Sequence, residues 1–134
     1  MTMPTRIHHV GVAVTDLDES IRLYTSALGA ELVHRATNEK EGLEAAFLRV
    51  GDGEIELMAA LRDDSPVGKF MARRGPGLHH VAYGVADIDR SLAEAREAGL
   101  ELIDSVPRIG MHGTRIAFVH PKSLEGVLTE FVET

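Results

Sequence analysis

The sequence contains two copies of one unit, and this duplication limits the fold more than any other feature of the chain. The stretch IHHVGVAVTDLDESIR at residues 7–22 aligns with LHHVAYGVADIDRSLA at residues 78–93, at a constant offset of 71 residues. Two later pairs continue the correspondence: GLEAAF (42–47) with GTRIAF (113–118), and EIEL (54–57) with LTEF (128–131) after a loop three residues longer. Because there are only two copies, we interpret them as a duplicated module rather than a solenoid.

Each copy is typical of a strand followed by a helix and three further strands. In the first copy Asp16 is the predicted helix N-cap, with Glu19 at the capping-box position, and Gly29 is predicted to end the helix. Asp87 and Gly99 take the corresponding places in the second copy. The predicted strands are 7–14, 30–35, 44–50 and 54–60, and then 78–85, 100–106, 115–120 and 127–133.

The length of 134 residues suits a single domain with its own core. Within this domain, residues 1–134, the repeat gives module one at 6–61 and module two at 77–133. A linker helix is expected between them at 65–75, because Ser65-Pro66 puts a capping side chain before a proline at the first helical position.

Composition excludes several classes of function. The formal net charge is −7, there is no tryptophan, and aromatic residues are 4%, which argues against nucleic acid as a partner. No segment has the apolar length of a membrane span, and the start of the chain lacks the apolar run of a signal peptide. The absence of cysteine excludes disulfides and thiolate metal ligands. We therefore expect a cytoplasmic protein without a membrane partner.

The two strands that begin the modules each carry a pair of histidines. Alternation places His9 and His80 on faces otherwise lined with glycine and alanine, which leaves room beside the imidazoles. His8 and His79 fall on the opposite, valine-rich faces, which are expected to meet a helix. Two equivalent histidines on open faces predict a metal site, since imidazole is the commonest metal ligand near neutral pH.

Acidic residues on the last strand of each module complete the predicted ligand set. Glu130 lies among apolar residues, where an uncompensated charge is costly unless it is paired or bound to a metal. Glu56 matches it in the first module, although Glu54 shares the face of Glu56 and remains an alternative. The metal site predicted from the residues is therefore His9, Glu56, His80 and Glu130, and its two nitrogens and two oxygens suit several divalent ions.

One matched pair differs in charge between the modules. Glu44 in GLEAAF corresponds to Arg115 in GTRIAF, so one module has an acid where the other has a base, as an asymmetric substrate would require. The remaining histidines, His34, His112 and His120, have no duplicated partner. We interpret these three as surface residues, or at most as supports of the metal ligands.

These residues and motifs resemble the vicinal oxygen chelate superfamily, which includes glyoxalase I, extradiol dioxygenases and methylmalonyl-CoA epimerases. The resemblance covers essentially the whole chain. The stretches RDDSPVGKFMARRGPGLHHVAYGVADID and RIGMHGTRIAFVHPKSLEGVLTEFVE are similar to the epimerases in particular, and HPKS at 120–123 leading into GVLTE is the most specific piece. The resemblance implies an α+β, glyoxalase-like fold, in which two tandem βαβββ modules form a curved mixed sheet around a metal-binding cleft.

By position, the resemblance implies metal ligands at His9, His80 and Glu130, with Glu56 as the fourth. Bacterial epimerases often have glutamine at this fourth position, so the glutamate is a departure. NEKEGLEAAFL at 38–48 matches the epimerase segment that holds a catalytic glutamate, which implies Glu44 and Glu130 as the acid–base pair.

The implied activity is epimerisation of methylmalonyl-CoA at C2, by proton abstraction and reprotonation through a metal-stabilised enolate. We expect Co²⁺ as the ion, with Ni²⁺, Mn²⁺, Zn²⁺ and Fe²⁺ as alternatives, an acyl-CoA as substrate and a homodimer as the assembly. Arg115 and Lys122 are candidates for binding a CoA phosphate or the substrate carboxylate. The alternatives are a glyoxalase I-type lactoylglutathione lyase, an extradiol dioxygenase and a non-catalytic protein that binds small molecules.

Overall fold

The computed structural model describes residues 4–134 and has the predicted order of two βαβββ modules. The elements are β1 (Arg6–Ala13), α1 (Leu17–Leu28), β2 (Glu31–Asn38), β3 (Leu43–Val50), β4 (Gly53–Ala60), α2 (Pro66–Arg74), β5 (Gly77–Val85), α3 (Ile88–Glu97), β6 (Arg108–Ile109), β7 (Arg115–Val119), the 3-10 turn η1 (Pro121–Leu124) and β8 (Thr129–Glu133). The predicted α+β class with two such modules is confirmed. Among the helices of residues 4–134, none has both the length and the apolar character that a membrane span requires.

The chain forms two compact units whose division falls inside β1 and β5. The first unit is Val10–His79, and the second combines the segment ending at His9 with His80–Thr134.

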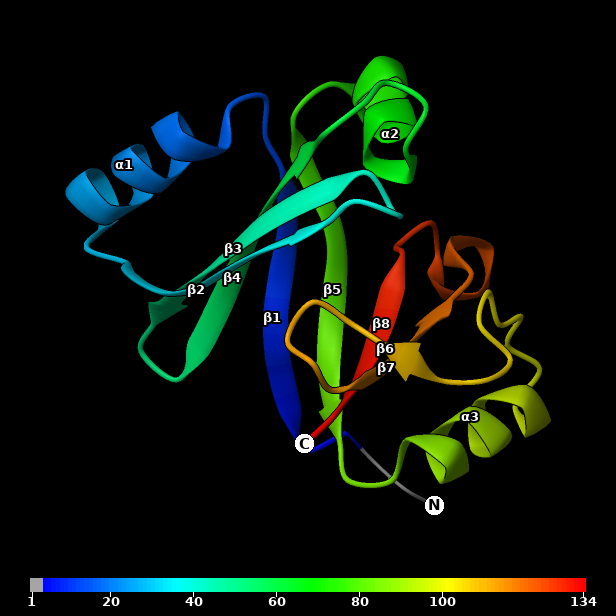
Figure 1. Ribbon diagram of the computed structural model, residues 1–134. Coiled ribbons are helices and arrows are strands. Elements are labelled where there is room, and N and C mark those ends of the chain that lie inside the picture. The colour runs from blue at the N-terminus through cyan, green and yellow to red at the C-terminus, as the bar shows by residue number, and fades with distance from the viewer. Residues whose placement is uncertain (1–3) are drawn as a thin grey trace. The chain divides into compact units, whose positions relative to one another are not determined.

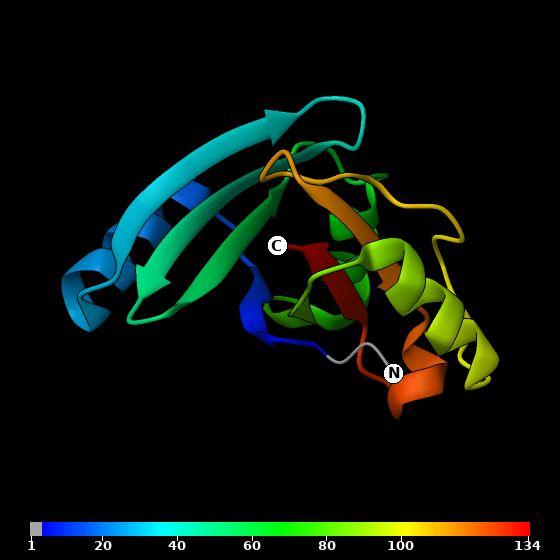
Figure 2. The ribbon, with the colours of Figure 1, turned by 90° about the horizontal axis from the view of Figure 1, so that it is seen from below.

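In the first unit the strands are ordered β2-β3-β4-β1, and α1 covers one face of β2, β3 and β4 (Figures 1 and 2). β2, β3 and β4 form an antiparallel meander. The buried side chains beneath α1 share one face of these strands; they include Ala46, Leu48, Leu57 and Ala59. The opposite face of β4 carries Met58, which packs with α2.

Both long helices begin at the predicted caps. The Asp16 side chain accepts a hydrogen bond from Glu19 N (3.0 Å), and Asp87 accepts one from Arg90 N (3.1 Å). Gly29 follows α1 in the left-handed conformation (φ 68°), which a residue with a Cβ adopts less readily.

The linker helix α2 also starts as predicted, with Ser65 accepting a hydrogen bond from Gly68 N (3.0 Å) and Pro66 at the first position. A Cβ on Gly68 would lie 2.5 Å from the carbonyl oxygen of Arg62. The helix therefore packs closely on the preceding turn only because residue 68 has no side chain.

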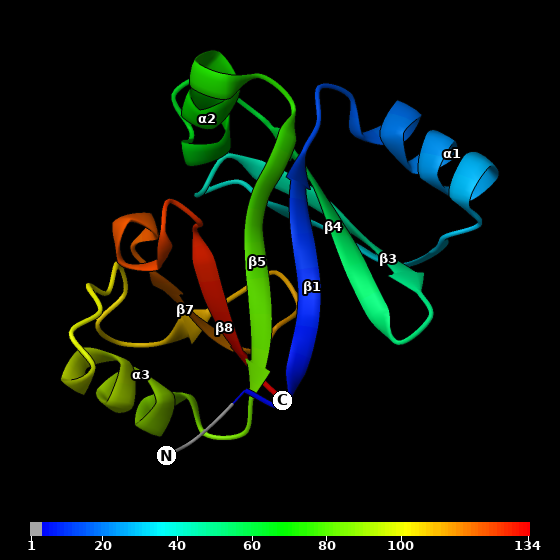
Figure 3. The same ribbon diagram turned by 180° about the vertical axis from the view of Figure 1, so that it is seen from behind.

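In the second unit the strands are ordered β5-β8-β7-β6, with β5 parallel to β8 and β7 antiparallel to it (Figure 3). The beginning of β1 joins this sheet, since Thr5 N donates to Gly84 O (2.8 Å). One face is covered by α3 and includes Ala117 and Phe131. The other face carries Ala82, Ile116, Val132 and Phe118.

The predicted strand at 100–106 is largely absent. Leu102 makes a single bridge to Val119, and the short strand β6 lies further on at Arg108–Ile109. Instead of continuing a ladder, the side chain of Asp104 accepts a hydrogen bond from Phe118 N (2.9 Å). Pro107, which has no N–H to donate, then separates this turn from β6.

Candidate metal centre

His9, His80 and Glu130 converge at one buried point of the second unit. His9 Nε2 lies 3.1 Å from His80 Nε2, and Glu130 Oε1 lies 3.0 Å from His9 Nε2 and 3.3 Å from His80 Nε2. The two histidines are each 3% exposed and Glu130 is 6% exposed. The structure therefore brings together three of the four predicted ligands within the second unit.

Strand register explains why these side chains meet. Glu130 on β8 is paired with Ala82 on β5 and with Phe118 on β7. Paired residues share a face of a sheet and residues two apart share it as well, so Glu130 falls on the face of His80. The ring of Phe118 packs edge-on against His80, with centroids 5.6 Å apart, and limits how that imidazole turns.

The spacing of the three donor atoms suits a metal ion. Ions bound about 2.0–2.1 Å from nitrogen and oxygen require neighbouring donors roughly 3 Å apart, which is the spacing observed here. Among residues 4–134, no donor makes a well-formed hydrogen bond to Glu130 Oε1, although this atom is buried. A buried carboxylate oxygen aimed at two imidazole nitrogens is what a divalent cation would satisfy.

The electrostatics favour an ionised Glu130. Burial raises the pKa of this carboxyl, but the imidazoles of His80 and His9 together outweigh burial and hold the pKa below its usual value. The side chain is therefore an anionic oxygen donor at neutral pH.

The second nitrogen of His9 has a neighbour that strand alternation does not predict. His8 Nδ1 lies 2.8 Å from His9 Nδ1, and the rings of both histidines contact His112. The expectation that His8 turns away from His9 is therefore wrong. His112 lies beside a predicted ligand, which agrees with the second of the two places expected for it. His79 does point to the helix side, packing against Phe70 of α2 with ring centroids 4.8 Å apart.

The other two histidines without a duplicated partner have structural contacts. His34 stacks on Phe47, with ring centroids 6.0 Å apart. His120 is the N-cap of η1, where its Nδ1 accepts a hydrogen bond from Lys122 N (3.1 Å).

Glu56, the fourth predicted ligand, lies on β4 in the first unit. It is 5% exposed, whereas Glu54 is half-buried, so burial favours Glu56 over its alternative. Its cross-strand partner is Phe47 on β3, and both side chains lie on the face opposite α1.

Glu44 lies on the other face of the same sheet. It is paired with Ala59, which belongs to the core beneath α1, whereas Ala45 is paired with Met58 on the face of Glu56. Its nearest described charge is Arg35, at 3.9 Å between Nη2 and Oε2, and its side chain is 28% exposed. This placement argues against the predicted role of Glu44 as a base beside the ligand Glu56.

Arg115 and Lys122, the candidates for binding an anionic substrate, are paired with acids of the chain itself. Arg115 donates to both oxygens of Glu133 (2.9 and 3.0 Å) and to Asp89 (2.8 Å), and these hydrogen bonds raise the pKa of the guanidinium. Lys122 lies 3.3 Å from Glu101. Both cations are therefore at least partly neutralised within the second unit.

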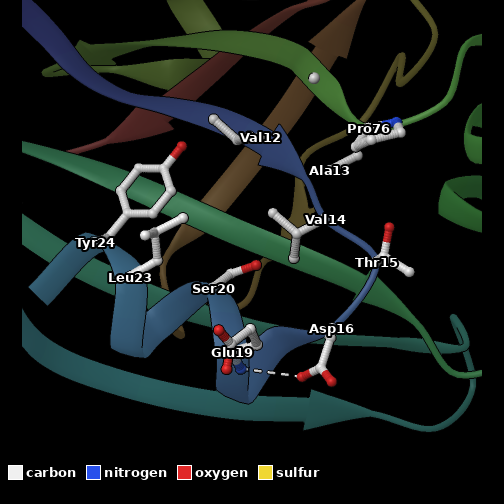
Figure 4. A pocket seen from close by; sticks show the side chains of 11 residues that line it. Val12, Ala13, Val14, Thr15, Asp16, Glu19, Ser20, Leu23, Tyr24 and Pro76 are labelled. Atoms are coloured by element: carbon white, nitrogen blue, oxygen red, sulfur yellow. Dashed lines mark hydrogen bonds between the residues drawn. The ribbon is translucent and has the colours of Figure 1, made fainter. Parts of the chain in front are cut away.

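A separate groove of about 450 Å³ lies in the first unit between β1 and α1 (Figure 4). Its apolar lining includes Val12, Val14 and Leu23, and its acidic residues are Asp16 and Glu19. Asp16 is engaged as the helix cap, as the dashed line in Figure 4 shows. None of the predicted metal ligands lines this groove.

Comparison with known proteins gives a consistent family. Residues 8–118 match the model of the glyoxalase/bleomycin resistance protein/dioxygenase superfamily. The chain is 35% identical to an ethylmalonyl-CoA/methylmalonyl-CoA epimerase of Cereibacter sphaeroides, over 93% of this chain and 95% of that protein. It is 40% identical to a solved methylmalonyl-CoA epimerase of Mycobacterium tuberculosis, with a TM-score of 0.94 over 99% of this chain and 90% of that one. A further solved methylmalonyl-CoA epimerase, in complex with methylmalonyl-CoA and ammonium, is 40% identical with a TM-score of 0.94, over 98% and 96% of the two chains.

Proposed function

The chain belongs to the glyoxalase/bleomycin resistance protein/dioxygenase superfamily, where its relatives include methylmalonyl-CoA epimerases, and we propose that it is an enzyme that epimerises methylmalonyl-CoA at C2. The single observation that carries the proposal is the buried cluster of His9, His80 and Glu130, which offers an ionised carboxylate beside two imidazole nitrogens. The substrate is proposed from the relative solved with methylmalonyl-CoA.

The proposal includes a divalent metal ion held by His9 Nε2, His80 Nε2 and Glu130 Oε1. Glu56 is proposed as the fourth ligand from its place in the repeat and its burial. Co²⁺ is the proposed ion, since nitrogen and oxygen donors without sulfur suit it; Ni²⁺, Mn²⁺, Zn²⁺ and Fe²⁺ share this preference. When bound, such an ion stabilises negative charge on the thioester and carboxylate oxygens of the substrate.

A residue of the chain is assigned to remove the C2 proton. The C2 proton lies between a thioester and a carboxylate, and its removal leaves an enolate. We assign its removal to Oε2 of Glu130, because Oε1 faces the imidazoles. The lowered pKa that keeps this carboxylate ionised also weakens it as a base, so Glu130 would have to detach from the ion to accept the proton. Glu44 is not assigned to this step because it lies on the α1 face of its sheet. Reprotonation on the opposite side of C2 is therefore assigned to water.

Exchange of the C2 proton with solvent tests the proposal. In deuterium oxide, metal-loaded protein should replace the C2 proton of methylmalonyl-CoA with deuterium, as followed by proton NMR, and a chelator should abolish the exchange. If the loaded protein instead isomerises the methylglyoxal–glutathione adduct without C2 exchange, it is a glyoxalase I-type lyase. If it catalyses neither reaction but binds the acyl-CoA, the non-catalytic alternative is correct.

We also propose a homodimer, which light scattering at micromolar concentration would show as about twice the chain mass of 14.6 kDa. A monomer under these conditions would contradict that part of the proposal.

A further inference from the structure

Three histidines of the second unit form a cluster on the far side of His9 from Glu130. His8 and His9 approach through their Nδ1 atoms at 2.8 Å, and the ring centroid of His112 lies 5.2 Å from that of His8 and 5.8 Å from that of His9. One ring nitrogen from each of the three lies within 4.8 Å of the others, which is close enough for all three to contact one ion after small side-chain rotations. His9 is buried and the other two are half-buried, so the cluster is accessible from one side.

The position of His112 is fixed by a tight turn between β6 and β7. Gly110 N donates to Thr114 O (2.9 Å), and Gly113 N donates to Gly110 O (3.0 Å). Gly113 has φ 82°, and a Cβ on Gly110 would lie 2.9 Å from Ile116, so both glycines are needed for this turn. The turn therefore places His112 where its imidazole lies beside His8 and His9.

We propose that His8, His9 and His112 form a second metal site, which binds Zn²⁺ or Cu²⁺. Its donors are His8 Nδ1, His9 Nδ1 and one ring nitrogen of His112. Three imidazoles without a carboxylate favour these two ions over Mn²⁺ or Mg²⁺, which prefer oxygen donors. One part of this proposal rests on the proposed function: His9 would serve both centres, with Nε2 at the first and Nδ1 at the second.

Binding at the second site replaces a proton with a metal ion. When His9 Nε2 holds the first ion, its Nδ1 carries hydrogen and donates it to His8 Nδ1 across the 2.8 Å contact. A second ion takes the place of that hydrogen, which leaves to solvent as a proton, and no electron is transferred. The imidazole ring of His9 would then separate the two ions by about 6 Å, given metal–nitrogen distances of about 2 Å.

Metal stoichiometry tests this second site directly. Chelator-treated protein is dialysed against Zn²⁺ at a series of free concentrations, and bound zinc is counted by atomic emission. We expect two equivalents in the wild type. In His112→Ala the second equivalent should bind at least about 100-fold more weakly, because loss of a direct ligand costs more than the 10–100-fold typical of an outer-shell change.

His34→Ala is the matched control, because it removes an exposed histidine of the first unit that is not part of the cluster. It should retain both equivalents. His112→Gln repeats the test with a side chain of similar size, and circular dichroism checks that each variant is folded. In the wild type, Cu²⁺ bound after one equivalent of diamagnetic Zn²⁺ should show superhyperfine coupling to three nitrogens, and His112→Ala should lose one of them.

The outcomes separate this site from the first one. A single equivalent that His80→Ala abolishes and His112→Ala leaves unchanged overturns the second site. So does a second equivalent that persists unchanged in His112→Ala and His112→Gln. If His80→Ala leaves zinc binding unchanged while His112→Ala abolishes it, the first centre fails and the second stands.

Discussion

The two modules agree on one face of their sheets and differ on the other. On the helix-covered face, β3 carries Glu44 beside Arg35, whereas the matching position on β7 carries Arg115, bound to Asp89 and Glu133. On the opposite face, both final strands carry a buried glutamate: Glu56 on β4 and Glu130 on β8. The matched acids are thus buried, whereas the mismatched residues form ion pairs within their own units.

This comparison changes the interpretation of the charge difference in the sequence. An acid opposed to a base between two modules suggests an asymmetric active site, but strand register puts both residues on helix-covered faces. Each is at least a quarter exposed and engages charges of its own unit. Changes on the face opposite the helices, which carries Glu56 and Glu130, should therefore affect activity. Changes on the helix-covered face should affect stability.

The largest effect on activity is expected from Glu130→Gln, on the face opposite α3. This change keeps the shape but removes the anionic oxygen next to His9 and His80, and loss of a general base typically costs about 10²–10⁴-fold in turnover. Turnover of methylmalonyl-CoA by the loaded variant is the measurement, with bound metal counted alongside. Turnover within threefold of the wild type would contradict the assigned role.

On the helix-covered face, Leu48→Ala should reduce stability rather than chemistry. Leu48 is fully buried beneath α1, and such a truncation typically costs about 2–5 kcal/mol in the free energy of unfolding. Urea denaturation followed by circular dichroism measures this. Folded Leu48→Ala protein should retain wild-type turnover per molecule. A loss of turnover in fully folded protein would contradict the claim that the helix-covered face affects stability and not activity.

A change of intermediate size is expected for metal binding in His8→Ala. His8 touches Nδ1 of His9, and removing such a support of a metal ligand typically lowers affinity about 10–100-fold. A competition titration with a chromogenic chelator measures the affinity of the first equivalent, with His34→Ala as the control. Unchanged affinity would mean that His8 does not orient His9.

The smallest effect is expected at the ion pairs around Glu133. Hydrogen bonds from Arg115 and from the backbone N–H of Ile88 hold the pKa of Glu133 below its usual value. Its ionised form therefore stabilises the fold at neutral pH, and this contribution is lost as pH falls below the ordinary glutamate value of about 4.3. The melting temperature of Glu133→Gln should be slightly below that of the wild type at pH 7, and the difference should shrink by pH 3. A difference that grows on acidification would reverse the sign and contradict the assignment.

The convergence of His9, His80 and Glu130 was predictable from the sequence because it depends on strand alternation and on the repeat. The offset of 71 residues identifies His9 with His80, and the EIEL–LTEF match prefers Glu56 to Glu54. The side of the sheet on which Glu44 lies could also have been predicted from the sequence. A two-residue turn at Gly51-Asp52 pairs Val50 with Gly53, and counting back from there places Glu44 opposite Ala59 rather than on the face of Glu56.

The histidine cluster was not predictable in the same way. His112 lies in a turn whose shape depends on two glycines, and alternation within a strand says nothing about where a turn directs its side chain. The missing strand at 100–106 has a similar origin, because the contact between Asp104 and Phe118 N joins residues far apart in sequence.

The most direct test of the central claim measures C2 proton exchange in Glu130→Gln and Glu44→Gln together, on metal-loaded protein with methylmalonyl-CoA in deuterium oxide. Glu44 lies on the α1 face, and Arg35 is its only partner among the described charges within 4.0 Å. Because such an exposed ion pair contributes little free energy, Glu44→Gln should exchange the C2 proton at a rate within about threefold of the wild type. Glu130→Gln should lose exchange by about 10²–10⁴-fold. The reverse result, with Glu44→Gln inactive and Glu130→Gln active, would contradict the claim that the buried His9–His80–Glu130 cluster performs the chemistry.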